Sequence, residues 1–421
     1  MATENPLNRQ SSSPNGRIAS LDLIRGLAIL GILTVNIEGF AGPIAATITP
    51  DWNGTADPAS HLAFAAVMVL FEGKMRALLS ILFGASMLLF LDSAEASGRD
   101  GVVLQIRRLI WLAVIGYLHF AVLWWGDILF TYACAGFIAL WLCRLPARTM
   151  TTAALLAFAA WHALGIAGSL SPVIAERQAD TAVSTPDQTR SVIAHRDEDR
   201  REALDQRQRE LGGFIPLAAH KLNEEATLPL IVSFNTLGET VPLMLVGMAL
   251  FRSGFFTGGW TRRRLRILGL GGLIAGGAAT LGFTAMAWAW HFPPVLMNAL
   301  FASWLAVPHL VMALGYAALL VLAARRFQGT GAAQRIAAVG RMALTNYLGC
   351  TVVMTALFYG WGLGLSGTVP ESRYGLFVMA AWLIMVTASP LWLRHFRQGP
   401  VEWLWRALTY GRTEPFRREQ Q

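Results

Sequence analysis

Residues 17–40 read R-I-A-S-L-D-L-I-R-G-L-A-I-L-G-I-L-T-V-N-I-E-G-F, a stretch apolar enough to span a bilayer although it carries Asp22, Arg25 and Asn36. On a helix, Arg25 lies about 60° and Asn36 about 40° around the axis from Asp22, so the three polar groups share one side. Ionisable groups inside a membrane are costly, and this side is expected to face a partner or a wet cavity. The alternative is that Asp22 and Arg25 form only a structural i,i+3 pair at the membrane edge.

The composition of the whole chain is that of a polytopic membrane protein. Of its 421 residues, 54% are hydrophobic and 14% are charged, and the mean hydropathy is +0.47, which excludes an ordinary soluble enzyme. The net charge of +8 is almost all arginine. These arginines sit between apolar segments, so membrane topology explains them better than nucleic-acid binding. The three cysteines lie inside apolar runs, and we expect neither a disulfide framework nor a metal site.

Apolar runs of the length needed to cross a bilayer recur along the chain. They predict an all-α polytopic transmembrane helical bundle of about ten spans. The second run is interrupted by the charged residues Glu72, Lys74 and Arg76, so it is expected to be bent, tilted or divided into two half-helices. The predicted spans are residues 20–41, 62–91, 106–124, 127–143, 150–170, 228–251, 266–290, 298–323, 340–361 and 374–394.

The arginines orient these spans. With the N-terminus in the cytoplasm, the short loops predicted on the outside contain a single arginine, Arg373, whereas the inner loops are rich in arginine. This asymmetry predicts that both termini are cytoplasmic. Residues 1–16 are polar and lack the apolar core of a signal peptide, so the first span is expected to be an uncleaved signal-anchor.

One hydrophilic insertion, residues 171–227, separates the spans into two groups of five and falls on the outside. Opposite charges recur at i,i+4 within it, which favours an exposed helix around residues 190–211, although a flexible solvated loop is equally consistent. The expected organisation is a cytoplasmic tail, an N-terminal five-span half, the extracytoplasmic insertion, a C-terminal five-span half and a cytoplasmic tail, at residues 1–19, 20–170, 171–227, 228–410 and 411–421.

The second predicted span carries three charged residues. Glu72 and Arg76 are i,i+4 and can pair on one helical face. Lys74 points about 200° away from Glu72. Because an unpaired lysine at this depth is costly, Lys74 is expected to meet a carboxylate or an anionic ligand.

The third span carries a histidine that can act as a base. His119 follows Arg108 by eleven positions on the same helical face, with the arginine at the cytoplasmic end. Asp127 comes soon after His119, and either Asp127 or Glu72 could be its carboxylate partner. A histidine beside a carboxylate suits general-base chemistry because its pKa lies near neutral. The alternative is that His119 is a hydrogen-bonded packing residue.

Cationic side chains collect on the inner side of the predicted bundle: Arg25, Arg107, Arg108 and Arg341. Arginine forks at a helix entrance suit phosphate groups. A polar path from these arginines to His119 would let a cytoplasmic phosphorylated donor deliver a group to an outside acceptor. Arg107 and Arg108 are equally consistent with ordinary positive-inside anchors.

Several motifs together resemble the YeiB-like family of bacterial membrane proteins, whose C-terminal half is a domain of unknown function. The resemblance covers nearly the whole chain and implies a location in the bacterial inner membrane. The motifs are L-D-L-I-R-G-L-A-I-L-G-I-L-T-V-N-I (21–37), E-G-K-M-R-A-L-L-S-I-L-F-G (72–84), R-R-L-I-W-L-A-V-I-G-Y-L-H-F-A-V-L-W-W-G-D-I-L (107–129), V-G-R-M-A-L-T-N-Y-L (339–348) and F-R-Q-G-P-V-E-W-L-W-R-A-L-T-Y (396–410).

The D-x-x-R-G…N pattern of Asp22, Arg25 and Asn36 also resembles a wider group of transmembrane acyltransferases. That group includes heparan-α-glucosaminide N-acetyltransferase and bacterial O-acyltransferases of surface polysaccharides. The resemblance implies an acyl donor such as acetyl-CoA from the cytoplasm and a cell-envelope acceptor on the far side. The glucosaminide enzyme's active-site histidine would fall near Thr47, where this chain has no histidine, so His119 is our substitute for it.

The sequence therefore predicts an acyltransferase-like membrane protein that moves an acyl group from a CoA-type donor to an acceptor hydroxyl or amine. His119, Asp127 and Glu72 are the candidate catalytic residues, and no metal is implied. A transporter or lipid-handling protein that uses Lys74, Glu72 and Glu239 is the alternative, as is a non-catalytic scaffold; a homo-oligomer is left open. The candidate donor-binding residues are Asp22, Arg25, Asn36, Lys74, Arg76, Arg107, Arg108 and Arg341.

Overall fold

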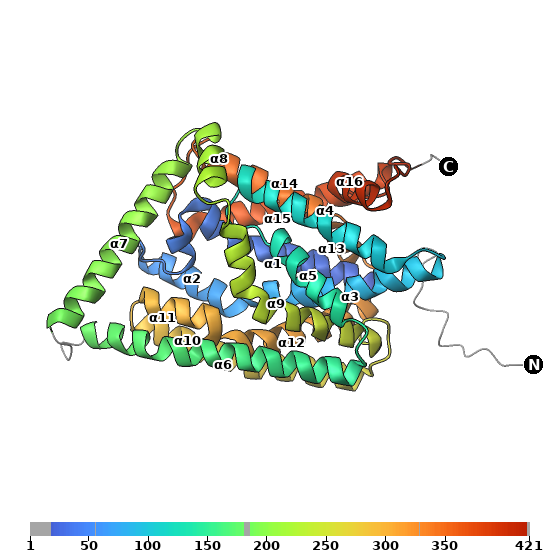
Figure 1. Ribbon diagram of the computed structural model, residues 1–421, viewed down its shortest axis with the longest axis horizontal. Helices are drawn as coiled ribbons and strands as arrows, with labels where there is room; N and C mark the ends of the chain where they lie inside the picture. The colour runs from blue at the N-terminus through green and yellow to red at the C-terminus, as the bar shows by residue number, and fades with distance from the viewer. Residues whose placement is uncertain (1–17, 55, 181–185, 328, 419–421) are drawn as a thin grey trace, which may run out of the picture.

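The computed structural model describes residues 18–54, 56–180, 186–327 and 329–418. These residues form helices and short connections, and no β-strand occurs among them, which confirms the all-α class (Figure 1). Residues 1–17 of the predicted N-terminal tail lie outside the described residues. The helices are α1 (Ala19–Ala41), η2 (Ile44–Thr47), α2 (Pro58–Leu70), α3 (Lys74–Ala96), α4 (Gly101–Val122), α5 (Leu129–Leu142), α6 (Ala147–Asp180), α7 (Pro186–Glu210), α8 (Phe214–Asn223), α9 (Leu228–Arg252), α10 (Arg262–Ala289), α11 (Pro294–Ala299), η3 (Leu300–Trp304), α12 (Ala306–Phe327), α13 (Gly331–Arg341), α14 (Ala343–Phe358), η4 (Glu371–Arg373), α15 (Tyr374–His395) and α16 (Pro400–Tyr410).

The helices fit a multi-pass membrane protein. Among the described residues, eight helical segments are long and apolar enough to cross a membrane, with α2 and α3 counted together as one segment of 39 residues. A ninth is the pair α13 and α14, which meet at 79°. The ten predicted spans all fall on helices, but residues 127–143 contain only α5, which has 14 residues. That helix is shorter than the roughly 20 residues a full span needs.

The charged interruption of the second span divides it into the half-helices α2 and α3. Gly73 has φ +70°, a left-handed conformation that favours glycine. A break inside a membrane frees backbone carbonyls, and these need partners within the protein. Lys74 Nζ donates to the Met68 carbonyl at 2.7 Å, and the Tyr316 hydroxyl donates to the Leu70 carbonyl at 2.9 Å. The buried lysine therefore caps the C-terminal end of α2, where a positive charge is favourable.

Helix α1 is at the centre of the bundle, in contact with α3, α12, α13, α14 and α15. Glycines allow its closest crossing. A Cβ on Gly26 would collide with the Ile336 carbonyl of α13, and one on Gly340 would collide with the Asp22 carbonyl of α1. Small residues that let backbones touch are the usual basis of helix packing in membranes.

The outer surface of the bundle is apolar along most of its height. Large hydrophobic side chains point outward from α6, α10 and α15, among them Leu156, Leu164, Ile274 and Leu383. A soluble monomer rarely exposes apolar patches of this extent, whereas a bilayer covers them without cost. The exterior thus supports the same conclusion as the helix lengths.

The insertion is helical and lies at one end of the bundle. Helix α6 continues past its predicted end at residue 170 to Asp180, and the exposed helix predicted around residues 190–211 is α7. Figure 1 shows α7 slanting across the end where α6 finishes, with α16 at the other end of the molecule. Glu176 accepts hydrogen bonds from the Val295 and Leu296 amides, at 3.2 and 2.9 Å, and so ties the far part of α6 to α11.

Two buried charged groups lie where α7 meets α8. Glu210 accepts a hydrogen bond from the Tyr359 hydroxyl at 3.3 Å, and its backbone carbonyl accepts one from the Gly360 amide at 3.0 Å. Burial raises the pKa of Glu210 to about 7. Lys221 on α8 is also buried, which lowers its pKa to about 8. The contact between the insertion and the bundle therefore contains groups that titrate near neutral pH.

Candidate functional site

His119 is the middle of a buried chain of hydrogen bonds. Its Nδ1 is 2.8 Å from Asp127 Oδ1, and its Nε2 is 3.0 Å from the Thr351 hydroxyl on α14. The His119 side chain is 1% exposed and the Asp127 side chain 2%. An ionised Asp127 accepts the Nδ1 proton, which leaves the Nε2 lone pair facing Thr351. The predicted pairing of His119 with Asp127 is thus present in the structure, and it extends one residue further.

Local backbone structure fixes this chain. Asp127 Oδ2 accepts the Phe130 amide at 2.8 Å in the first turn of α5, so the carboxylate also caps that helix. Asp127 lies close to Gly116, where a Cβ would collide with the Phe130 amide. His119 is in the last turn of α4. The short connection from α4 to α5 therefore brings the aspartate back onto the histidine.

The hydrogen-bonded chain of Asp127, His119 and Thr351 is called the histidine relay below. A narrow cavity lies beside this relay, between α1 and α14. Its volume is about 10 Å³, room for a single water molecule. Asn36 and Thr351 both line it, so the hydroxyl at the end of the histidine chain and the asparagine of the opening stretch face one space. The complete lining is Ile29, Ile32, Leu33, Asn36, Phe40, Asn346, Tyr347, Cys350 and Thr351.

At the other end of α1, the predicted Asp22–Arg25 pair is formed. Arg25 Nη1 is 3.0 Å from Asp22 Oδ1, and its Nη2 donates to the Ser86 hydroxyl at 2.8 Å. Arg108 lies near enough for electrostatic repulsion with Arg25. Its guanidinium carbon is 4.6 Å from the ring centre of Phe90 and packs equally closely on a tryptophan of α16. Two of the four predicted inner arginines therefore lie together and half-buried.

The other two inner arginines are placed differently. Arg107 is exposed on α4, about 100° around the helix axis from Arg108. Arg341 ends α13, and its Nη2 donates to the Arg397 carbonyl at 3.5 Å. The structure therefore separates the four-residue group expected from the sequence into a close pair, Arg25 and Arg108, and two peripheral residues.

A second group of ionisable side chains lies near the middle of α1, because Gly31 packs against Phe71 and Met75 of the break between α2 and α3. The i,i+4 spacing predicted that Arg76 pairs with Glu72, but this ion pair is not formed. The Nη2 of Arg76 is 2.9 Å from Glu239 Oε2 on α9. Arg76 pairs with the distant Glu239 and not with the neighbouring Glu72, because Glu72 lies in the non-helical break before α3 begins.

Glu72 is not beside His119. The charges that act on Glu72 are those of Arg76, Lys74 and Glu239, whereas His119 is bonded to Asp127 and a threonine. Lys74, expected to meet a carboxylate or an anion, hydrogen bonds to a backbone carbonyl, with Glu72 near enough for attraction. Glu72, Lys74 and Arg76 thus belong to a different part of the bundle from the histidine relay.

Several buried polar residues were not predicted from the sequence. Thr351 was missed because a threonine in an apolar span usually bonds its own backbone, and only the fold shows that it meets a histidine. His309 gives only a weak sequence signal, yet its ring packs on Gly73 and its Nε2 has no hydrogen-bond partner among the described residues. Glu38 is buried near the C-terminal end of α1 with an unpartnered Oε2. As a glutamate within the opening stretch itself, it was a signal that the sequence offered. Among the described residues, no three His, Cys, Asp or Glu side chains gather as metal ligands would.

Comparison with known proteins gives relatives of undetermined activity. Residues 250–412 match a family described as a protein of unknown function, DUF418. The uncharacterized protein YeiB of Escherichia coli (strain K12) is 32% identical over 408 residues, which cover 95% of this chain and 98% of that protein. The uncharacterized protein YxaH of Bacillus subtilis (strain 168) is 28% identical over 420 residues, covering 96% and 97%. No solved structure matches the chain.

Proposed function

Because this chain belongs to the YeiB-like family of multi-pass membrane proteins, whose named relatives are uncharacterized, we propose its activity from the site: it is an inner-membrane acyltransferase. It takes an acyl group, such as acetyl, from a CoA-type donor on the cytoplasmic side. It passes that group to a hydroxyl or amine of a cell-envelope acceptor on the other side. The proposal rests on the Asp127–His119–Thr351 chain of hydrogen bonds, which ends at a cavity that Asn36 lines.

The relay has the parts that general-base chemistry needs. Asp127 holds His119 in the tautomer whose Nε2 can accept a proton. In that tautomer, Thr351 can donate to Nε2, and it lines the cavity. When the acceptor oxygen or nitrogen bonds to the acyl carbon, its proton passes to Thr351 while the Thr351 proton passes to His119 Nε2. The carbon–sulfur bond breaks, and the leaving thiolate takes the proton back through the same path, so that atoms and charge balance.

The inner end of α1 supports a phosphorylated donor. Arg25 and Arg108 lie together at the end of the helix whose other half lines the cavity. Arginine is the side chain best suited to diphosphate groups. The cavity of about 10 Å³ is far smaller than a thioester arm, so α1 and α14 must move apart for a donor to enter.

The first test uses native protein in inside-out membrane vesicles supplied with acetyl-CoA that is labelled in the acetyl group. We expect label in envelope material, and we expect His119→Gln to reduce its rate by about a hundredfold or more. The matched control is His195→Gln on α7, where the histidine side chain is 73% exposed; this variant is expected to retain full activity.

Two results would contradict the proposal. One is the absence of acetyl-CoA binding by purified protein whose helix content and thermal transition are normal. The other is equal transfer by native protein and His119→Gln at equal expression. The thermal transition also shows how much of the variant is folded. A fall in transfer that only matches a fall in folded protein is therefore recognised as a folding defect.

A second candidate function is coupled transport, and the charged group near the middle of α1 favours it. The Arg76–Glu239 ion pair is 2.9 Å long. Lys74, Arg76 and His162 lie near enough to the buried His309 for their charges to act on it. Ionisable residues at this depth commonly mark ion and proton paths.

Proteoliposomes carrying an internal pH dye separate the two candidates. If the second is correct, a valinomycin-imposed potassium diffusion potential drives proton flux in the absence of CoA, and Glu239→Gln abolishes it. Flux equal to that of protein-free liposomes removes this candidate and leaves the first one untouched.

A further inference from the structure

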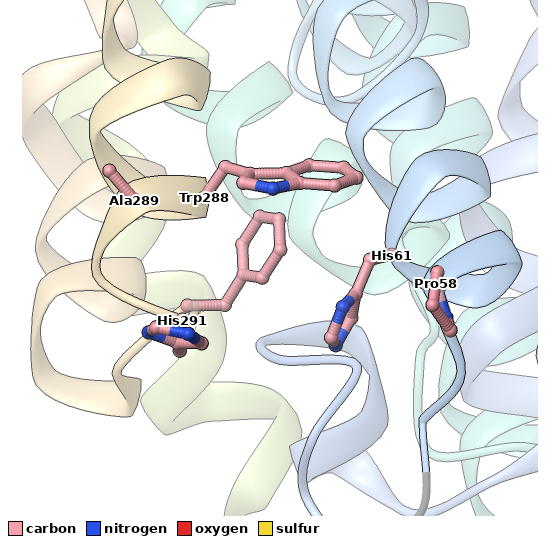
Figure 2. A pocket seen from close by; sticks show the side chains of 6 residues that line it. Pro58, His61, Trp288, Ala289 and His291 are labelled. Carbon is pink, nitrogen blue, oxygen red and sulfur yellow. The ribbon is translucent and has the colours of Figure 1, made fainter.

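A larger cavity lies between α2 and the end of α10, and it shares no lining residue with the cavity beside the histidine relay (Figure 2). Its volume is about 370 Å³, within the range of small-molecule sites. His61 and Pro58 of α2 form one wall. The end of α10, with Trp288 and Ala289, and the connection from α10 to α11, with His291 and Phe292, form the other.

Three rings line this cavity and contact one another. The ring centres of His61 and Trp288 are 5.9 Å apart, those of His61 and Phe292 are 5.6 Å apart, and those of Trp288 and Phe292 are 5.7 Å apart. Two of the three pairs meet edge-on, so the rings present faces in different directions. Aromatic groups set at angles around one space are the geometry by which proteins enclose quaternary ammonium ions.

The backbone is strained to hold this wall. His291 and Phe292 are consecutive non-glycine residues with positive φ, 60° and 50°, a conformation that costs energy and clusters at ligand clamps. Three hydrogen bonds hold it: the Phe292 amide to the Ala287 carbonyl at 2.7 Å, the His291 amide to the Trp288 carbonyl at 3.0 Å, and Thr49 Oγ1 to the Phe292 carbonyl at 2.9 Å. The result places Phe292 inward and His291 at the rim.

Carboxylates stand behind the aromatic wall. Asp51 Oδ2 is 2.8 Å from His61 Nε2. Asp57, the N-cap of α2, is near enough to His61 for electrostatic attraction. Asp51 and Asp57 are both close enough to Glu371 to repel its carboxylate. Carboxyl groups therefore lie close to the cavity, although none of its six lining residues is acidic.

The lining decides between ligand classes. A sugar would bring several hydroxyl groups, and most of them would lose water without finding a partner, because the side chains of the wall offer only the imidazoles of His61 and His291 and the indole N–H of Trp288 as polar groups. An organic cation without hydrogen-bond donors needs only aromatic faces and nearby negative charge. We propose that this cavity binds a quaternary ammonium group, either of a free small molecule or of a lipid headgroup at the outer membrane surface. This site is independent of the proposed acyl transfer.

The test measures choline binding to the purified full-length protein in detergent by isothermal titration. The neutral probe is 3,3-dimethylbutan-1-ol, which has the shape of choline without its charge. We expect choline to bind at least about tenfold more tightly than the alcohol. Equal affinity for both probes, or no choline binding, would overturn the proposal.

Variants locate the binding. Trp288→Leu removes one ring, and Asp51→Asn removes a charge while it keeps the shape; each is expected to weaken choline binding by about fivefold to tenfold. Trp141→Leu is the matched control, because Trp141 on α5 is 82% exposed and outside the cavity. If both cavity variants bind choline as the native protein does while their thermal transitions are normal, the cavity is not the site.

Lipid arms distinguish the source of the ammonium group. Nanodiscs of phosphatidylcholine are compared with nanodiscs of phosphatidylethanolamine and phosphatidylglycerol. Competition with free choline only in phosphatidylcholine identifies a headgroup site. Equal binding of free choline in both lipids identifies a small-molecule site, and either result supports a quaternary ammonium ligand.

Discussion

Thr351 connects the buried histidine to the cavity, and its role depends on a single hydroxyl. Its Oγ1 lies 3.0 Å from His119 Nε2 and 3.3 Å from the Tyr347 carbonyl one turn back. It can therefore donate to either group or accept from a protonated histidine. One helical turn further on, Thr355 is equally buried, but its hydroxyl donates to the Thr351 carbonyl at 2.7 Å and touches no titratable group.

These two threonines form a matched pair for experiment. Thr351→Val is expected to cost about 1 kcal/mol of stability, because it removes one hydrogen bond and leaves a buried nitrogen without a partner. Under the proposed mechanism it also lowers acyl transfer by about a hundredfold. Thr355→Val is expected to cost a similar amount of stability with transfer retained. Equal transfer by the two variants would show that the hydroxyl of Thr351 is only structural.

Sequence pattern predicted the pairs that local spacing controls. Asp22 and Arg25 are three positions apart, His119 and Asp127 eight positions apart, and both pairs are formed. The expected Glu72–Arg76 pair is absent, because spacing on a helix says nothing once the helix is broken between the two residues. Glu239 and Thr351 come from distant helices, so only tertiary packing reveals that they are the partners of Arg76 and His119.

At the scale of elements, the bend between α13 and α14 shows what a specific sequence motif can be for. Glu402 of α16 accepts the Leu344 and Thr345 amides at 2.7 and 3.0 Å. Its carboxylate therefore caps α14 beyond the 79° bend. On the same helix, Trp405 Nε1 donates to the Arg108 carbonyl at 2.9 Å. The motif at residues 396–410, whose residues the sequence could not assign, thus fastens the end of the chain to α4 and α14.

The crossing of α1 and α13 is expected to tolerate no added carbon. Gly340→Ala places a Cβ against the Asp22 carbonyl, a backbone atom that cannot rotate away. We expect a loss of about 1–3 kcal/mol in the free energy of unfolding, seen as a lower thermal transition in detergent. Gly349→Ala on α14 is the control, because nothing lies within 4 Å of its Cβ, and it is expected to be neutral or slightly stabilising. Equal transitions for the two variants would contradict the close crossing.

The contact of α7 with the bundle is expected to loosen as pH rises. The pKa of Glu210 is raised by burial to about 7, so the folded contact binds a proton that an exposed glutamate, with its ordinary pKa of 4.5, has already released. Its stabilising effect is therefore complete below about pH 4.5 and is lost as pH rises through about 7. Hydrogen-exchange protection factors of residues 205–224 should be lower at about pH 7.5 than at about pH 5. Glu210→Gln should remove this difference, and a native difference that persists in the variant would assign it to another group.

At the scale of the whole molecule, the sequence predicted the fold class but not the contacts between distant segments. Hydropathy alone predicted a helical membrane bundle, because lipid imposes the same requirement on every span. It could not predict that α6 continues beyond its apolar part, since a polar helix that projects from the membrane has no hydropathy signal. Nor could hydropathy predict the histidine relay or the larger cavity, because each is assembled from segments hundreds of residues apart.

The positive-inside pattern makes a prediction about the two ends of the molecule. In a variant without the three native cysteines, His195→Cys on α7 should react with a membrane-impermeant maleimide in bacterial cells whose outer membrane is permeabilised and whose inner membrane is sealed. A cysteine at Arg412, after α16, should react only once the inner membrane is opened. Labelling of both sites while the inner membrane is sealed, or of neither, would contradict the orientation.

The shortness of α5 has a consequence for the surrounding lipid. Its 14 residues reach about 21 Å along the helix axis, whereas the hydrocarbon layer is about 30 Å thick. Phe137, Ile138 and Trp141 nevertheless face outward from it. The bilayer beside α5 is therefore expected to be pinched, with headgroups drawn inward at one flank of the protein. Asp127 caps the N-terminal end of this helix, which is the end predicted to face the outside. Such a dimple is therefore expected to bring the polar surface of the membrane sideways toward the histidine relay, and a lipid-borne acceptor would have a lateral route to it.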